Sequence, residues 1–271
     1  MATQGGLPAI NDIRVLDPFR WLGGAWLDLW RAPLPLLTYG LLVAAGSAAL
    51  AYGIYVTNAA FWVLALTFGF VFVAPVLAMG PYEAGRRLEM GERPKLADIL
   101  LVRTALRQDV AYLGLALLLI YFFWGRIAQV VYGLSTYRLY HTAPEFVDFA
   151  LRTPEGHNML MAGSVVGGAL AFFTFTMVVV SAPMLLDPAA NMFAATASSF
   201  RAVSRNPGPM LLWAVLIALL VGICVATGFL GMILIFPWLG LASWRAYRAL
   251  VAEAPAPRVV QRPPLKPVAT R

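Results

Sequence analysis

The sequence predicts an all-α polytopic membrane protein with six transmembrane helices, arranged as three consecutive helical hairpins. Its composition is 61% hydrophobic and only 12% charged over 271 residues, which is too apolar for a protein with a water-exposed surface on all sides. The apolar residues form long runs, and the short segments between these runs carry nearly all Lys and Arg residues. An internal repeat, described below, predicts the grouping into hairpins.

Six stretches are long and apolar enough to cross a bilayer. A hydrocarbon core about 30 Å thick requires about 20 helical residues, and a helix satisfies its backbone hydrogen bonds internally. The stretches cover residues 34–56, 61–82, 110–132, 159–184, 209–227 and 228–247. We expect a disordered lead over residues 1–10, without the features of a secretory signal, and a membrane domain over 11–250. The proline-rich basic tail over 251–271 is also expected to be disordered.

The basic residues are divided unequally between the two sides of these spans. Seventeen of the 20 Lys and Arg residues flank one side, and only Arg126, Arg138 and Arg152 lie on the other. Because basic residues accumulate in cytoplasmic loops, we expect a bacterial inner-membrane protein with both termini in the cytoplasm. The net charge of +7 accompanies no nucleic-acid recognition module, so we assign it to topology and to contact with anionic lipids of the bilayer.

An internal repeat relates the beginning and the end of the chain. The run Arg31-Ala-Pro-Leu-Pro aligns with Arg205-Asn-Pro-Gly-Pro, and Arg107 precedes the third span in the same way. Repeats of this kind indicate one structural unit used several times. Each predicted unit has a cytoplasmic amphipathic segment, an outgoing span and a returning span with a proline near its cytoplasmic end. These three prolines are Pro75, Pro183 and Pro237.

The three prolines are expected to kink their helices, because proline removes one backbone hydrogen bond and clashes with the preceding turn. Interrupted helices at matching repeat positions are typical of transporter binding sites. A small transporter or channel with a path between the kinked helices is therefore one hypothesis, and simple packing geometry is the other. The absence of an ionisable residue from the middle of the predicted spans favours packing, since such residues mark ion and proton paths.

The amphipathic segments carry apolar residues at helical spacing, with aromatic and Arg side chains suited to a membrane interface. Two placements remain open, in the interface or packed beneath the bundle. The predicted interfacial anchors are Trp21, Trp26, Trp30, Arg31, Arg107, Phe200 and Arg205.

The outward connection over residues 133–158 is the largest predicted element on its side, and its aromatic residues indicate either a lid over the bundle or a docking loop for a partner subunit. Its histidines, acids and methionines could in principle bind copper, but their spacing matches no known site, so we predict no metal. No catalytic or cofactor-binding motif is present, and we predict no enzyme and no cofactor. The candidate docking residues are Tyr137, Tyr140, His141, Phe146, Phe149 and His157.

Two sequence runs resemble a bacterial integral membrane family known as domain of unknown function 2189. They are Pro-Val-Leu-Ala-Met-Gly-Pro-Tyr-Glu from Pro75 to Glu83 and Ser-Ala-Pro-Met-Leu-Leu-Asp from Ser181 to Asp187. The resemblance covers roughly residues 12–250. Some members are labelled as a cytochrome c oxidase subunit, which implies an accessory or assembly role, because the chain has no histidine inside a span to ligate haem or copper. The sequence therefore predicts a non-catalytic accessory, assembly or scaffold protein, with another membrane protein complex as its partner.

Overall fold

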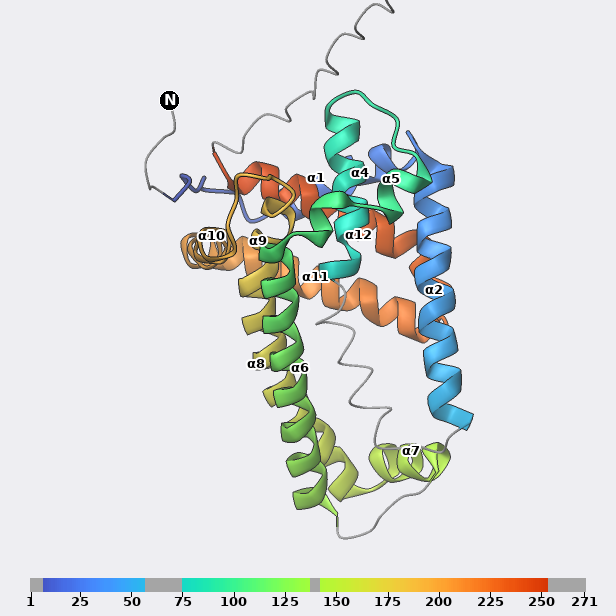
Figure 1. Cartoon of the computed structure of the whole chain (residues 1–271). Helices are drawn as coiled ribbons and strands as arrows, with labels where there is room; N and C mark the ends of the chain where they lie inside the picture. The colour runs from blue at the N-terminus through green and yellow to red at the C-terminus, as the bar shows by residue number, and fades with distance from the viewer. Residues whose placement is uncertain (1–6, 57–74, 137–141, 253–271) are drawn as a thin grey trace, which may run out of the picture.

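The computed structural model describes residues 7–56, 75–136 and 142–252, and within them the regular elements are helices (Figure 1). An isolated antiparallel β-bridge between Ile10 and Val251 is the exception. The elements are α1 (Asp17–Leu29), α2 (Pro33–Val56), α4 (Met79–Glu89), α5 (Leu96–Leu100), the 3-10 helix η1 (Arg103–Leu106), α6 (Gln108–Ser135), α7 (Ala143–Arg152), α8 (Pro154–Val178), α9 (Ser181–Met184), α10 (Met192–Arg205), α11 (Pro207–Ala226) and α12 (Met232–Leu250).

Four stretches of the described residues are long and apolar enough to cross a membrane. They are Pro33–Gly53 in α2, Gln108–Ser135 in α6, Pro154–Met184 in α8 and α9, and Pro207–Ala226 in α11. They correspond to the first, third, fourth and fifth predicted spans. Most of the second predicted span lies outside the described residues.

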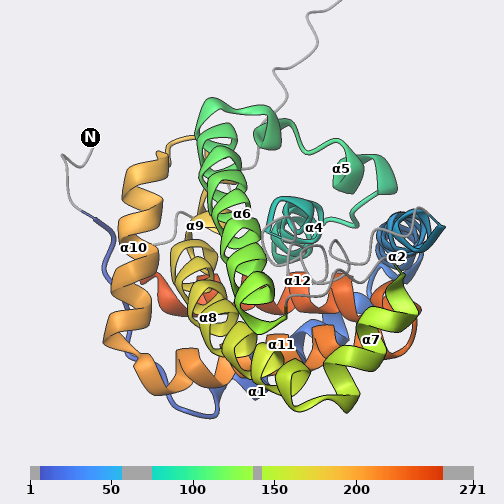
Figure 2. The ribbon, with the colours of Figure 1, turned by 90° about the horizontal axis from the view of Figure 1, so that it is seen from below.

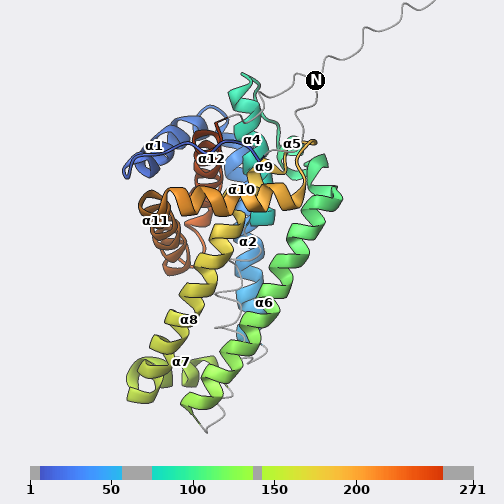
Figure 3. The same cartoon turned by 90° about the vertical axis from the view of Figure 1, so that its left-hand side faces the viewer.

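The predicted arrangement of six spans in three hairpins is not confirmed. Helix α12 occupies most of the sixth predicted span but is not among the four candidates, because polar and basic residues occupy its second half. In addition, α11 lies crosswise to α6 and α8 in Figures 1 and 3. The four apolar helices therefore do not form one parallel bundle.

The two ends of the molecule are built from different helices. Helices α2 and α6 begin, and α8 ends, at the end where α1, α4, α5 and α10 lie, which we call the basic end (Figure 1). The adjacent helices α6 and α8 extend away from it as an arm, and α7 lies across the far end of this arm (Figures 1 and 2). The helical amphipathic segments α1 and α10 thus belong to the basic end, as do the starts of two spans.

Helix α12 is the centre of the main core and packs against α1, α2, α4 and α11. Small residues permit this close packing. A Cβ atom at Gly240 would overlap Pro81 of α4, and a Cβ atom at Gly85 of α4 would lie 2.8 Å from the indole of Trp244. Most of α12 is consequently buried by protein, which explains how an apolar helix can sit here without facing lipid.

The N-terminal segment is bound to the end of α12 and to the junction between α10 and α11. Asn11 donates its backbone N–H to the Leu250 carbonyl over 2.8 Å, and Ile13 donates to Oδ1 of Asn206 over 2.9 Å. Nδ2 of Asn206 donates in return to the Asn11 carbonyl over 3.0 Å. Ile10, the last residue of the predicted lead, is buried like Val251, whereas residues 1–6 and 253–271 lie outside the described part of the chain.

Helix α7 forms a second, small core at the end of the arm. Phe146, Phe149 and Ala150 of α7 are buried together with Met159 of α8. The hydroxyls of Thr142 and Thr153 cap the N-termini of α7 and α8, accepting from Glu145 and Gly156 respectively, as cap residues commonly do. The backbones come close because Gly156 has no side chain, and a Cβ atom there would overlap the Phe149 carbonyl oxygen.

Replacing Gly156 by alanine is expected to detach α7 from the arm without affecting the main core. The new methyl group must displace the α7 backbone, and overpacking of this kind costs about 1–3 kcal/mol. Hydrogen exchange in detergent should then show faster exchange of the amides of residues 143–152. Gly163→Ala is the control, because Gly163 is also on α8 but the described part of the chain has no atom within 4 Å of the added Cβ. Equal exchange in the two variants would contradict the assigned packing.

Candidate functional site

The predicted kink prolines lie in three different settings. Pro237 is inside α12, Pro183 is in the short helix α9, and Pro75 is in a helical turn that precedes α4; all three are buried. At Pro237, proline has no N–H to donate to the carbonyl of Ile233, four residues earlier. Gly40 of α2 packs directly on this carbonyl, where a Cβ atom would overlap the oxygen. Protein therefore covers the irregular backbone at this proline.

A fourth proline, Pro81, which is not among the predicted kink positions, has a comparable arrangement. Proline at position 81 leaves the Leu77 carbonyl without its usual helical donor. The Tyr39 hydroxyl of α2 donates to that carbonyl over 2.6 Å. A neighbouring helix thus supplies the hydrogen bond that the proline removes, as backbone groups in apolar surroundings require.

The break between α8 and α9 is held by one serine of α10. Ser199 accepts a hydrogen bond from the Val180 N–H over 3.1 Å and donates its own proton to the Thr176 carbonyl over 2.6 Å. Both bonds are buried and connect segments about 20 residues apart. The Ser199 hydroxyl therefore replaces the helical bonds that are lost where α8 ends and α9 begins.

Replacing Ser199 by alanine is expected to lower the free energy of unfolding by about 1–3 kcal/mol, because the Val180 N–H and the Thr176 carbonyl would be buried without partners. Ser198→Ala is a matched control, since Ser198 is equally buried but, within the described ranges, bonds only to the Ala194 carbonyl of its own helix. Thermal unfolding in detergent micelles should show a distinctly lower midpoint for Ser199→Ala. A similar decrease in both variants would show that loss of buried volume, and not loss of the two Ser199 hydrogen bonds, is responsible.

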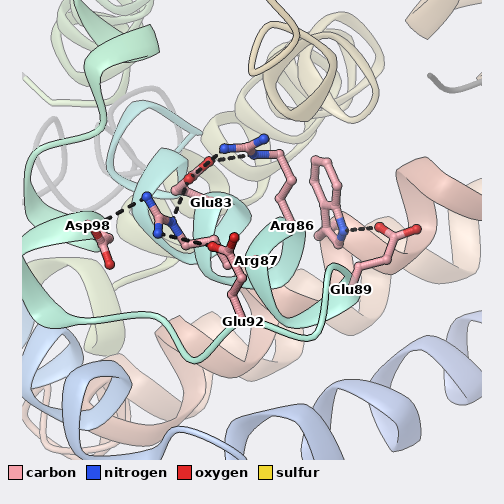
Figure 4. A network of polar contacts seen from close by, with 7 residues as sticks. Glu83, Arg86, Arg87, Glu89, Glu92 and Asp98 are labelled. Carbon is pink, nitrogen blue, oxygen red and sulfur yellow. Dashed lines mark hydrogen bonds and ion pairs between the residues drawn. The ribbon is translucent and has the colours of Figure 1, made fainter. Parts of the chain in front are cut away.

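The most heavily charged cluster of the basic end is centred on Glu83 of α4 (Figure 4). Glu83 is only 5% exposed. Arg86 binds both of its carboxylate oxygens over 2.7 Å, and Arg87 binds Oε1 over 2.8 Å. Arg87 also pairs with Glu92 and Asp98 over 3.3 Å each, which joins α4 to α5. The hydrogen bonds from Arg86 to Glu83 raise the pKa of that guanidinium, so it stays charged at every physiological pH.

Two further carboxylates connect α12 to its neighbours. Glu89 of α4 accepts from the Trp244 indole over 3.1 Å and pairs with Arg248 over 2.9 Å. Asp28 of α1 is buried and pairs with Arg245 over 2.5 Å. The absence of a side chain at Gly24 lets Arg245 reach Asp28, because a Cβ atom there would lie 2.6 Å from Nη1. The charges of the basic end thus bind helices to one another.

The aromatic residues among the predicted interfacial anchors separate into two groups. Trp26 and Trp30 are exposed, and Phe200 is partly exposed and contacts the ring of Phe173. Trp21 is buried in the main core, where its ring meets Trp213 edge-on at 5.6 Å, so the prediction that it anchors the interface is wrong. The amphipathic pattern identified α1 correctly but did not distinguish its two apolar faces.

The three arginines among these anchors are bound to protein groups. Arg31 pairs with Asp28 over 3.2 Å. Arg107 donates to the carbonyls of Asp187 and Ala190 and pairs with Asp109. Arg205 pairs with Asp12 over 2.6 Å. These contacts indicate a structural use of the three side chains in addition to any contact with lipid.

The ion pair between Arg205 and Asp12 predicts a small acid sensitivity of the N-terminal segment. Hydrogen bonding by Arg205 lowers the pKa of the Asp12 carboxyl from 3.8. A carboxyl with a lowered pKa contributes stability above its unfolded pKa, and this contribution disappears as the pH falls through the folded pKa. Attachment of the segment through this pair should therefore be unaffected at neutral pH and weaken only below about pH 4.

The outward loop presents fewer groups to a partner than predicted. Phe146 and Phe149 are buried against α8, so the expectation that they form a docking surface is wrong. His157 is exposed, and its Nε2 lies 2.8 Å from the Leu151 carbonyl. Tyr137, Tyr140 and His141 lie outside the described residues.

Sequence reasoning could have found part of the charged cluster. Glu83, Arg86 and Arg87 are spaced at i, i+3 and i+4, the spacing of ion pairs on one helix face. The pair of Asp28 and Arg245 carries no such signal, because 217 residues separate the two. The same holds for Tyr39, whose acceptor is 38 residues away.

Comparisons with known proteins give one match. Residues 63–187 match the family described as Predicted integral membrane protein (DUF2189). No curated protein and no solved structure shows significant similarity to the chain. The match includes α4 with its Glu83 cluster, and α6, α7, α8 and α9. The resemblance predicted from the sequence is thus confirmed, and over residues 63–187 this chain is matched to the integral membrane family of domain of unknown function 2189.

Proposed function

We propose that the protein is a non-catalytic scaffold or accessory subunit of the bacterial inner membrane that acts by packing against another membrane protein. The observation that carries this proposal is the contrast between the two ends of the molecule. Carboxylates of the basic end are engaged by arginines, while the arm of α6 and α8 extends with large apolar side chains on its surface, among them Leu119, Phe122, Phe123 and Val165.

The outer face of α8 offers a place for a partner helix. Its sequence contains two pairs of small residues at a spacing of four, Gly163 with Gly167 and Ser164 with Gly168. The Trp124 ring of α6 covers Gly167, at 2.9 Å from a Cβ placed there, but no atom of the described residues lies within 4 Å of such a Cβ at Gly168. Small residues let membrane helices approach closely, so the second pair supports intermolecular packing. By the family resemblance, a respiratory oxidase complex is the first partner to test.

Photo-crosslinking in native membranes tests this proposal. A photoreactive residue at Val165 should give one defined protein adduct, identified by mass spectrometry, and Gly168→Leu should abolish it. Gly222→Leu on α11, where an added Cβ also meets no atom within 4 Å in the part of the chain that the structure describes, should leave the adduct intact. Adducts with lipid alone, or an adduct that survives Gly168→Leu, would count against a packing role for this face.

The proposed orientation has a separate test. If both termini are cytoplasmic, a fluorescent protein fused to the C-terminus should fluoresce, and alkaline phosphatase fused after Arg152 should be active. The reversed pattern would contradict the orientation but not the packing role.

The transport alternative has less support, because α2 already covers the irregular backbone at two prolines. Tyr39 binds the carbonyl that lacks its helical donor at Pro81, and Gly40 packs on the corresponding carbonyl at Pro237. Ion flux through reconstituted liposomes above that of empty liposomes would favour it.

A further inference from the structure

Helix α1 is apolar on two opposite faces. Its inner face, with Trp21, Leu22, Ala25 and Leu29, belongs to the main core. Its outer face carries the exposed residues Leu16, Phe19, Trp26, Leu27 and Trp30. An amphipathic helix packed on a protein core normally presents polar residues outward. The outer face of α1, defined by these five residues, is therefore expected to contact a second apolar surface outside the main core.

The outer face of α1 continues into a candidate membrane span. Helix α1 ends at Leu29, and α2 begins at Pro33. Leu27 and Trp30 are 67% and 53% exposed, and Leu34 in the first turn of α2 is 78% exposed. An exposed apolar surface thus passes from α1 to the helix that enters the bilayer, within a few residues of chain. This continuity places the outer face at the level of the lipid headgroups and not in open solvent.

The aromatic residues of this face suit the boundary between headgroups and acyl chains. The ring of Trp26 contacts those of Trp30 and Trp238 at centroid distances of 5.6 and 5.4 Å. The Trp238 indole donates its N–H to the Leu22 carbonyl over 2.9 Å, but within the described chain no acceptor is found for the N–H of Trp26 or Trp30. An indole with an apolar body and an unused donor favours the membrane interface, where lipid carbonyls and phosphates accept hydrogen bonds.

The two arginines beside this face pair with aspartates of α1, one of which, Asp28, also pairs with Arg245. Arg20 pairs with Asp17 over 3.0 Å, and Arg31 pairs with Asp28 over 3.2 Å. Amphipathic helices bind membranes by burying apolar area and by the attraction between their basic residues and anionic headgroups. Here, that attraction is reduced by the aspartates, which leaves burial of aromatic and leucine side chains as the main contribution.

We propose that the outer face of α1 is a lipid-docking surface that inserts into the headgroup boundary of one leaflet, and that its docking depends on Phe19, Trp26, Leu27 and Trp30 and not on anionic lipid. This surface is separate from the outer face of α8, and either assignment can fail without the other. The role of α1 is then to fix the depth at which α2 enters the bilayer.

Spin-label accessibility in nanodiscs tests the proposal. Single cysteines are introduced at Leu27, at Glu92 in the exposed turn after α4, and at Leu119 on the lipid-accessible side of α6, in a Cys224→Ala background. These three positions are exposed, so labels fit without repacking. The accessibility of each label to oxygen, which concentrates in lipid, is compared with its accessibility to a water-soluble nickel chelate. We expect an oxygen-to-nickel ratio at position 27 severalfold above that at position 92 and closer to that at position 119.

Lipid composition provides the second part of the test. The ratio at position 27 should be the same in nanodiscs of phosphatidylcholine and in nanodiscs that also contain phosphatidylglycerol. Trp26→Ala with Trp30→Ala should lower it. A ratio equal to that at position 92 would place the face in water, and protection from both reagents would show a protein covering; either result overturns the proposal. A ratio that rises only with anionic lipid would overturn its independence of headgroup charge.

Discussion

Replacement of Gly40 by alanine is expected to cause the largest loss of stability of any single methyl addition to α2. The added Cβ would overlap the backbone carbonyl oxygen of Ile233, and it would also lie 2.8 Å from the carbonyl carbon. Backbone atoms cannot rotate away as a flexible side chain can, so α2 and α12 must separate. Overpacking of a core costs about 1–3 kcal/mol and occasionally more, and we expect the upper end of this range.

The matched control for Gly40→Ala is Gly46→Ala, six residues later on the same helix. Among the described residues, no atom lies within 4 Å of a Cβ at Gly46, and alanine has a helix propensity about 1 kcal/mol better than that of glycine. The control should therefore be neutral or slightly stabilising. Thermal unfolding in detergent, monitored by the reaction of buried Cys224 with a thiol-specific dye, distinguishes the two. Equal midpoints for both variants would exclude the close contact between α2 and α12.

Replacement of Glu83 by glutamine is expected to cause the second large effect. The buried carboxylate binds Arg86 and Arg87 at once, and its neutralisation leaves Arg86 without its partner. Removing one member of a buried ion pair costs about 3–5 kcal/mol. We expect about 2–3 kcal/mol here, since the two arginine side chains remain 29% and 28% exposed and solvent reduces the penalty.

The control for Glu83→Gln is Asp148→Asn on α7. Asp148 pairs with Arg152 over 3.1 Å at the same i, i+4 spacing, but the two side chains are 61% and 80% exposed. Exposed pairs contribute about 0–1 kcal/mol, so the thermal midpoint should hardly change. High salt should also leave the effect of Glu83→Gln largely intact, since buried pairs are weakly screened. A midpoint for Glu83→Gln within error of that for Asp148→Asn would show that the cluster contributes little to stability.

The local features of the fold could be predicted from the sequence. The first and fifth predicted spans, 34–56 and 209–227, agree with α2 and α11 to within two residues at either end. The reason is that the length of an apolar run and a proline at the first helical positions are both local signals. The same reasoning predicted helical amphipathic segments where α1 and α10 are found.

The location of α12 could not be predicted in this way. An apolar run indicates removal from water, but it does not distinguish burial in lipid from burial in protein. The glycines that bring α12 against α2 and α4, Gly40, Gly85 and Gly240, resemble any other glycines in an apolar run. The aromatic residues Phe146 and Phe149 were misinterpreted for the related reason that exposure depends on a neighbouring helix, here α8.

The contacts of the N-terminal segment impose an order on the assembly of the protein during synthesis. Asn11 and Ile13 bind Asn206 and the last turn of α12, which leave the ribosome some 200 residues later. During most of translation, therefore, the amphipathic helix that follows this segment has no α12 to bury its inner face. The chain must insert its early spans before the inner face of that helix is covered by α12. The β-bridge between Ile10 and Val251 then forms as one of the last steps. A truncation that removes only the final turn of α12 would consequently leave the opposite end of the polypeptide held by Arg205 and Asn206.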